Sequence, residues 1–114
     1  MHELSIALSI LDIAAEEAKR LGGSVAAIHL RLGPLSGVAP AALRSAYGLA
    51  REMSALPKAE LVIDEVPLVG YCATCTAERS PPSELELFCP VCSTPMPQIL
   101  GGRELEVVAL ELEA

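Results

Sequence analysis

Apolar and polar side chains alternate with the period of an α-helix along residues 4–21. Apolar residues recur there at steps of three and four, while polar residues fall on the opposite side. Gly22 and Gly23 follow, and glycine commonly ends a helix because it adopts a left-handed backbone at little cost. The pattern predicts an amphipathic helix whose buried stripe comprises Leu4, Leu8, Leu11, Ala15 and Ala18.

Three further segments have the pattern of β-strands, and one has that of a second helix. Residues 24–32 and 59–66 alternate between two faces, which is typical of half-buried strands. Residues 104–112 contain the apolar run Val107–Leu110, which fits a central strand covered on both faces. Between the first two strands, Pro40 suits a first helical turn, and the expected buried stripe comprises Leu43, Ala46, Tyr47, Ala50 and Met53.

The order of these elements favours an α/β chain of the α+β type. Two helices packed on a three-stranded sheet is the simplest arrangement that buries all the apolar stripes. A segment with four cysteines interrupts the pattern before the last strand, with proline and glycine on both sides. We therefore expect one α/β domain of residues 1–70 plus 97–114, and an inserted zinc-ribbon lobe of residues 71–96.

The four cysteines form two Cys-x-x-Cys pairs separated by thirteen residues: Cys72, Cys75, Cys89 and Cys92. This spacing is close to that of zinc ribbons, in which each pair directs two sulfurs toward one ion. Four thiolates leave no ligand position open on Zn²⁺, so the predicted role of the ion is structural. The alternatives are an iron site of the rubredoxin type, a redox dithiol or two disulfides.

The inserted lobe has too few apolar residues to order itself. Its main apolar side chains are Leu85, Leu87, Phe88 and Val91. These cannot offset the conformational entropy lost by a segment of this length. We therefore expect bound zinc to supply the missing stability.

Composition and charge exclude several classes of protein. No apolar run reaches the ~20 residues that cross a bilayer, and the N-terminus lacks the basic residues of a signal peptide. We therefore expect a cytoplasmic protein without membrane insertion. The net charge of −7 opposes binding to a phosphate backbone, so nucleic acid is a poor candidate partner. Nothing in the sequence pairs a nucleophile with a base, and we expect no enzyme activity.

His2 makes the amino terminus a candidate metal site. Its imidazole can bind an ion together with the α-amine of Met1 and the amide nitrogen between them, in one plane. Planar nitrogen coordination suits Ni(II) and Cu(II), and Glu3 could add a fourth donor. The alternative is an exposed histidine at a frayed end. His29, the other histidine, is expected simply to face solvent.

Several motifs in the correct order resemble the hydrogenase maturation nickel metallochaperone family, HypA/HybF. They are the start Met1–Ser5, the turn Leu32–Val38, the knuckle Cys89-Pro90-x-Cys92 and the final Gly102-x-Glu104-Leu105. The resemblance implies a carrier that delivers Ni(II) to the large subunit of a NiFe hydrogenase, working with the maturation GTPase HypB. It also implies nickel as transient cargo at Met1, His2 and Glu3, with zinc on the four cysteines.

Two points qualify this interpretation. Some members of the family carry histidines beside the zinc cysteines, whereas Ser93 and Thr94 follow Cys92 here, so a pH-sensing role is not expected. The rival hypothesis is an acidic zinc-ribbon module for protein–protein interaction, of the transcription-accessory type, with no nickel role. Whether the protein forms a homodimer and which hydrogenase it serves are left open by the sequence.

Overall fold

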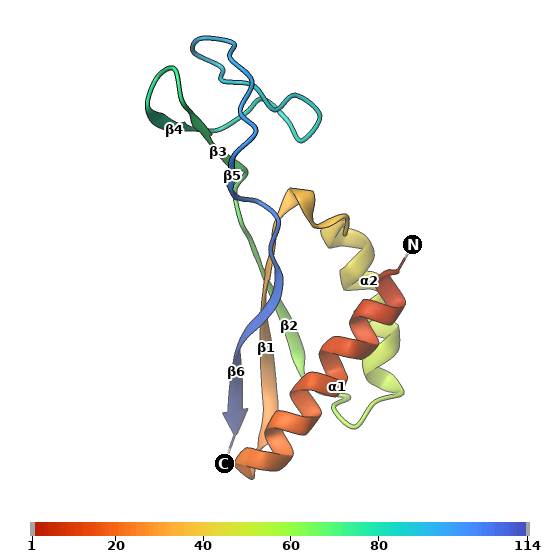
Figure 1. The fold of residues 1–114 in the computed structure, drawn as a ribbon. Helices are drawn as coiled ribbons and strands as arrows, with labels where there is room; N and C mark the ends of the chain where they lie inside the picture. Colours follow the sequence, from red (N-terminus) through yellow and green to blue (C-terminus); the bar gives the residue numbers. More distant parts are fainter. Residues whose placement is uncertain (1, 114) are drawn as a thin grey trace. The chain divides into compact units, whose positions relative to one another are not determined.

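The computed structural model describes residues 2–113 and confirms the expected fold class (Figure 1). The chain runs through α1 (Glu3–Leu21), β1 (Ser24–Leu32), the short 3-10 helix η1 (Pro34–Ser36), α2 (Pro40–Glu52) and β2 (Glu60–Glu65). It continues through β3 (Val69–Cys72), β4 (Ala77–Arg79), β5 (Ile99–Gly101) and β6 (Leu105–Glu113). Two long helices and a three-stranded sheet of β2, β1 and β6 therefore accompany a separate cysteine-containing lobe. No helix within residues 2–113 is long and apolar enough to cross a membrane.

The chain divides into two compact units. The first contains the residues up to Arg31, Val38–Asp64 and the residues from Glu106 onward. The second contains Leu32–Gly37 and Glu65–Leu105. The second unit thus extends beyond residues 71–96, where the sequence placed the lobe, because β3, β5 and the turn after β1 belong to it.

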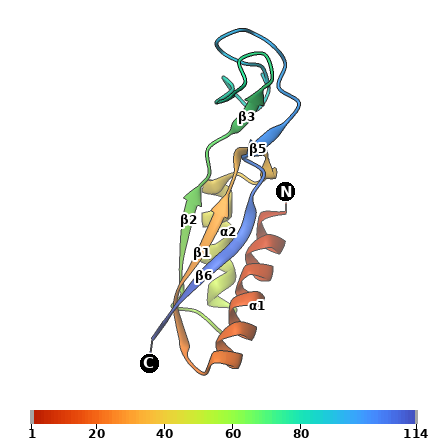
Figure 2. The same ribbon diagram turned by 60° about the vertical axis from the view of Figure 1, so that its left-hand side comes forward.

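In the first unit, β1 is the central strand and β6 is an edge strand, in the order β2-β1-β6. Figures 1 and 2 show β1 and β2 running in the same direction and β6 in the opposite direction, with both helices on one face of the sheet. The crossover through α2 accounts for the parallel pair, because two parallel strands need such a connection. A central last strand covered on both faces was only one explanation of its apolar run, and the strand order excludes it.

The apolar run of β6 is partly exposed instead of buried. Val108 is 51% exposed and Leu112 is also exposed, while Val107 and Leu110 are half-buried. A run of apolar residues has the same appearance in the sequence whether it lies in the middle of a sheet or at its edge. The order of the strands therefore decides the exposure.

The buried face of α1 differs from the predicted stripe. Leu11 and Ala18 are buried as expected, but Leu4 and Leu8 are exposed. The face that packs inward carries Ala7, Ile10, Leu11, Ala14 and Ala18. Small alanine side chains let α1 pack closely against α2, where the predicted residues Leu43, Tyr47 and Ala50 are buried. Met53, expected in that stripe, lies just past the end of α2 and is exposed.

The second unit contains its own sheet, in the order β4-β3-β5. Gly70 faces Arg79 of β4 and Ile99 of β5, so both sides of β3 are paired. A Cβ built on Gly70 would lie 3.3 Å from the Met96 methyl, so glycine makes room for this fully buried side chain. The segments with proline and glycine on both sides of the cysteines therefore form part of a sheet.

A contact between two glycines closes the base of this unit. Gly33 N–H donates to Glu104 O at 2.8 Å, and Leu35 N–H donates to Gly102 O at 2.7 Å. The Glu104 carboxylate accepts the Gly102 N–H at 2.7 Å. A Cβ on Gly33 would lie 2.2 Å from the Gly102 carbonyl carbon, so the two backbones meet where no side chain fits.

Candidate metal sites

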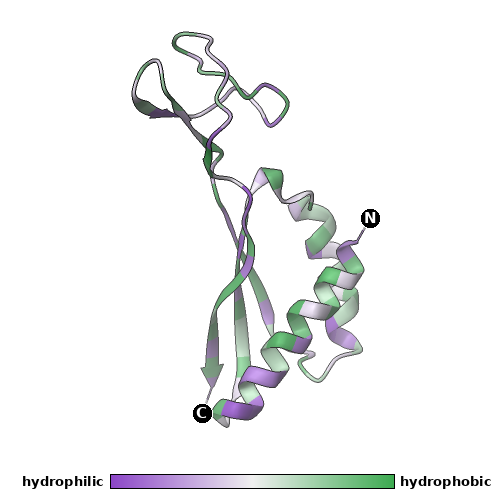
Figure 3. Cartoon of the chain, viewed as in Figure 1, coloured by the Kyte–Doolittle hydropathy of each residue, from purple (hydrophilic) through white to green (hydrophobic). Residues whose placement is uncertain are grey.

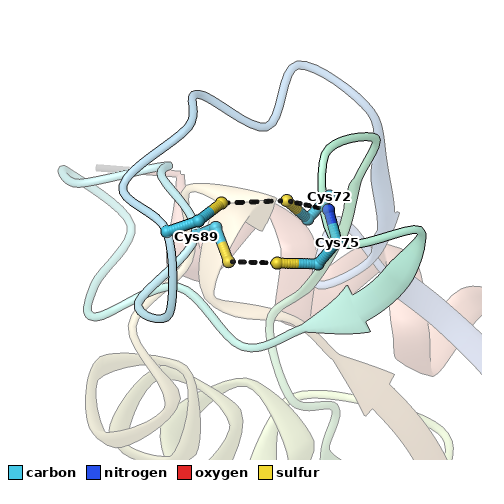
Figure 4. A group of neighbouring side chains, drawn as sticks. Cys72, Cys75 and Cys89 are labelled. Atoms are coloured by element: carbon cyan, nitrogen blue, oxygen red, sulfur yellow. Dashed lines mark hydrogen bonds between the residues drawn. The ribbon is translucent and has the colours of Figure 1, made fainter.

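The structure brings the four cysteines together at one point of the second unit. Cys72 ends β3, Cys75 lies in the following turn, and Cys89 and Cys92 belong to the second pair, more than ten residues later. Their four sulfur atoms all lie within 4.8 Å of one another. Among residues 2–113 this is the one cluster of three or more side chains that could hold a metal ion. Figure 4 shows Cys72 and Cys75 facing Cys89 from the other pair.

The sulfur separations fit a tetrahedral ion. Cys72 Sγ lies 3.4 Å from Cys92 Sγ, and Cys75 Sγ lies 3.9 Å from Cys89 Sγ. With Zn–S bonds of about 2.3 Å, a regular tetrahedron has S···S edges of about 3.8 Å. Both contacts are far longer than the ~2.05 Å of a disulfide bond, and all four cysteines are free. The donor set fits zinc.

The electrostatics of the cluster also favour a bound cation. A hydrogen bond with Cys92, followed by burial, raises the pKa of Cys75 to about 12, because a further negative sulfur is unfavourable there. Hydrogen bonds from the hydroxyl and the backbone of Thr94 lower the pKa of Cys92 to about 6. Against the effect of burial, backbone hydrogen bonds from Cys92 and Val91 lower the pKa of Cys89 as well. The cluster thus favours thiolates at Cys89 and Cys92 and resists one at Cys75. A divalent ion removes this conflict.

The backbone of each knuckle holds its sulfurs in place. Cys75 N–H donates to Cys72 Sγ at 3.3 Å, and Cys89 N–H donates to Thr94 O at 2.8 Å. The residue after each pair, Thr76 or Ser93, has a left-handed backbone with φ of 50° or 63°. This repeated turn reverses the chain after the second cysteine of each pair.

Replacing Ser93 by glycine is expected to stabilise the zinc-loaded lobe by about 1 kcal/mol, because a left-handed backbone is strained for residues with a Cβ. Ser93→Ala, which keeps the Cβ, is the matched control and should leave the stability unchanged. The measurement is the free energy of local opening from amide hydrogen exchange of residues 89–96. An equal change in the free energy of local opening by both substitutions would refute the proposed backbone strain at Ser93.

The lobe has a small core. Its buried cluster consists of Cys72, Cys89 and Met96, with Cys75 packed against it. Leu85 is 90% exposed and Val91 is also exposed, so these two apolar side chains of the lobe lie outside the cluster. Two of the three buried side chains are therefore metal-ligand candidates.

Arg79 is a residue that the sequence reasoning did not connect with the cysteine cluster. It lies in β4, and hydrogen bonding to Cys75, followed by hydrogen bonding to Cys89, raises the pKa of its guanidinium. A cation beside four thiolates offsets part of their negative charge. In the sequence Arg79 was only the single basic residue of an acidic segment, and β-pairing places it against the sulfurs.

The predicted nickel residues lie at the start of α1. Met1 lies outside the described residues. His2 is the N-terminal cap of α1, its side chain is exposed, and it makes no capping hydrogen bond. Its carbonyl accepts the Ile6 N–H at 2.8 Å, which is the first bond of the helix, and Glu3 is the first helical residue.

His29 does more than face solvent. Its ring Nε2 lies 2.5 Å from a Glu111 carboxylate oxygen of β6, and the side chain is half-buried. Arg31 pairs with Glu106 of the same strand at 3.4 Å. Two side-chain contacts therefore join β1 to β6, and among the described residues no third potential ligand completes a metal site at His29.

A family model described as "Hydrogenase/urease nickel incorporation, metallochaperone, hypA" matches residues 1–112. Similar curated proteins carry the name hydrogenase maturation factor HypA. The protein from Chloroflexus aggregans is 46% identical over 97% of this chain and 98% of its own length. The protein from Chloroflexus aurantiacus is 47% identical over the same shares.

A relative from Synechocystis, named guanidine hydrolase-activating protein A, is 42% identical over 97% of this chain and 94% of its own length. Among solved structures, the Ni metallochaperone HypA from Helicobacter pylori is similar, with a TM-score of 0.66 and 26% identity. That match covers 100% of this chain and 99% of the other. A second solution structure of a HypA protein has a TM-score of 0.69 and 25% identity, covering 99% and 97%.

Proposed function

Because the chain belongs to the HypA family of nickel metallochaperones in hydrogenase maturation, we propose that it binds Ni(II) at its N-terminus and delivers it to a NiFe hydrogenase. The proposed ligands are the α-amine of Met1, the imidazole of His2 and the amide nitrogen of His2. Glu3 supplies the fourth donor through its amide nitrogen or its carboxylate. Nickel is the cargo, and the family to which the chain belongs is not one of enzymes.

The observation that carries this proposal is where α1 begins. The first backbone hydrogen bond of the helix joins Ile6 N–H to His2 O, so the amide nitrogens of His2 and Glu3 precede the helical hydrogen bonds. Ni(II) in a planar nitrogen site takes the place of amide protons. Binding at these two amides therefore breaks no hydrogen bond of the helix. The exposed imidazole of His2 completes a chelate that partner proteins can reach.

The four cysteines are proposed to hold a permanent zinc ion that keeps the lobe folded. Cys72, Cys75, Cys89 and Cys92 close the coordination sphere, which excludes a water nucleophile on the ion. The two ions would then differ in lifetime, because a carrier must release nickel but not its structural ion. The division of roles between a nickel-binding domain of residues 1–70 plus 97–114 and a zinc-binding lobe of residues 71–96 is part of this proposal. The compact unit that contains this lobe is larger, with Leu32–Gly37 and Glu65–Leu105.

The family indicates that the partners belong to the hydrogenase maturation machinery. We propose that they include the GTPase HypB and the hydrogenase large subunit. We also propose that the protein works in the cytoplasm. The relatives with 46% and 47% identity are named for hydrogenase, which favours that client. The relative from Synechocystis is named for guanidine hydrolase, so related chains serve more than one enzyme.

Titration of untagged protein with Ni(II) is expected to give d–d absorption of a planar complex at a stoichiometric amount of metal. His2→Ala is expected to abolish that absorption, because it removes the imidazole from the chelate. An extension of several residues before Met1 is expected to do the same, because it moves the α-amine out of reach of the ion that His2 holds. Neither change should lower the thermal stability, since the His2 side chain is exposed and makes no capping hydrogen bond.

His29→Ala is the matched control, because it removes the other histidine and should leave nickel binding intact. Nickel binding retained in His2→Ala would refute the N-terminal site. Native protein without nickel absorption would refute the proposed carrier chemistry as a whole. The rival hypothesis of an acidic zinc-ribbon module without nickel is not favoured, since the family match covers residues 1–112.

A further inference from the structure

The free edge of β6 and the hollow beside it form a surface that neither metal site uses. Within residues 2–113, β6 pairs with β1 on one side and with no strand on the other. A groove of about 390 Å³ lies between this strand and α1 in the first unit. We call it the β6 groove, and its lining consists of Ile13, Glu17, Leu21 and Val107–Leu110.

Of the features that keep exposed strands from pairing, the β6 edge has only acidic side chains. Natural edge strands are protected by charged side chains, proline, bulges or short length, because their unpaired N–H and C=O groups can template another strand. β6 is nine residues long and contains no proline, lysine, arginine or glycine. Hydrophobic positions lie between hydrophilic ones along it (Figure 3). The edge is therefore suited to accept a further strand.

The groove offers an apolar seat for alternate side chains of such a strand. On the helix side Ile13 is 55% exposed and Leu21 is similarly exposed, and on the strand side Val108 is 51% exposed. When an extended segment adds to a sheet edge, main-chain hydrogen bonds provide the affinity and side chains at every second position provide the specificity. A helix beside the edge creates the pocket for these side chains.

We infer that the β6 groove binds an extended segment of a partner protein in which apolar side chains alternate with lysine or arginine. Charge decides the occupant. Glu106, Glu111 and Glu113 lie in β6, which has no basic residue, and Glu17 lines the groove. A second copy would bring the same acidic strand and a net charge of −7, and like charges across paired strands are destabilising.

The ion pairs of β6 do not remove this preference. Arg31 pairs with Glu106 and His29 with Glu111, both from β1 on the paired side of the strand. Arg20 pairs with Glu17 of the groove. These side chains are exposed or half-buried, and a single ion pair near the surface contributes little. A basic segment at the free edge therefore still meets an acidic surface.

The test uses a fluorescent nine-residue peptide of alternating lysine and valine, with blocked ends, and the zinc-loaded full-length protein. Val108→Lys is expected to weaken binding about tenfold or more, measured by fluorescence anisotropy, since it places a charge in the apolar groove. Val62→Lys is the matched control: Val62 is 41% exposed on β2, the other edge strand, and its variant should bind within about twofold of wild type.

A second pair of variants examines the helix side of the groove. Ile13→Lys is expected to weaken binding in the same way. Leu49→Lys is its control, because Leu49 is 65% exposed on α2, outside the groove, and its variant should bind as wild type. All four residues are exposed, so the thermal midpoints of the variants should match that of wild type.

Two modified peptides examine the backbone hydrogen bonds. One is N-methylated at every valine and the other at every lysine. In an added strand, every second residue directs its side chain into the groove, and the N–H groups of these residues all point to one edge of the strand. Methyl groups on the amides that face β6 block the hydrogen bonds, whereas methyl groups on the other amides do not. One modified peptide should therefore bind and the other should not.

Four outcomes would overturn the inference. The first is no binding of the parent peptide. The second is equal weakening by Val62→Lys and Val108→Lys. The third is binding of both methylated peptides, which would show adsorption by charge only. The fourth is a wild-type dimer in light scattering that Val108→Lys converts to monomer, which would make a second copy the occupant. The test needs no nickel, so its result is independent of the proposed carrier function.

Discussion

Replacing Cys89 by alanine is expected to abolish zinc retention and to unfold the cysteine lobe while the first unit stays folded. Cys89 is fully buried, and the lobe's buried cluster otherwise contains only Cys72 and Met96. Structural zinc contributes on the order of 10 kcal/mol or more near neutral pH, far beyond what one buried methionine provides. Three remaining thiolates leave the ion an open position and a weaker site.

Hydrogen exchange and metal analysis check this prediction. The amides of β3 and β5 should lose protection in Cys89→Ala, whereas those of β1 should keep it, because β1 lies in a sheet of its own with β2 and β6. Removing zinc from the wild type with a chelator should have the same effect.

Val91→Ala is the matched control, because Val91 lies between the ligands Cys89 and Cys92 and its side chain is exposed. It should retain the full amount of zinc. A Cys89→Ala protein with a full equivalent of zinc and a protected lobe would contradict the assignment. A strongly coloured wild-type protein as purified would instead indicate iron on the same four thiolates.

The second large effect is expected for Gly33→Ala, which should lower the free energy of unfolding by about 3 kcal/mol or more. The added methyl would lie 2.2 Å from both the carbonyl carbon and the oxygen of Gly102, and 2.8 Å from a Glu104 carboxylate oxygen. The nearest atoms belong to the backbone, so no side-chain rotation relieves the overlap. The bonds from Gly33 and Leu35 to this segment would have to break.

Gly48→Ala is the control with the opposite sign. Gly48 lies inside α2, and a methyl built on it meets nothing within 4 Å. Alanine there should raise the stability by about 1 kcal/mol, since glycine is unfavourable within a helix. Denaturant unfolding of both variants at saturating zinc gives the comparison. A Gly33→Ala protein as stable as the wild type would show that the glycine contact can move apart at little cost.

Local features of the chain were predictable from the sequence because they depend on residues close together along it. The strand at residues 24–32 was placed at its observed bounds, and the start of α2 at Pro40 was correct, since side-chain period and proline act within one turn or strand. The spacing of Cys72, Cys75, Cys89 and Cys92 similarly predicted the convergence of four sulfurs. His2 was singled out from its position alone, and its role as a nickel ligand stays a prediction.

Contacts between distant segments were decided only by the tertiary structure. β6 became an edge strand and Leu8 an exposed residue, although their apolar character suggested burial, because strand order and the packing of α1 on α2 involve many residues at once. Arg79 reached the sulfurs through the pairing of β4 with β3. The motif Gly102-x-Glu104 is another contact between distant segments, because its glycine and its carboxylate lie against Gly33. The hydrophobic pattern of a single segment cannot predict such a contact.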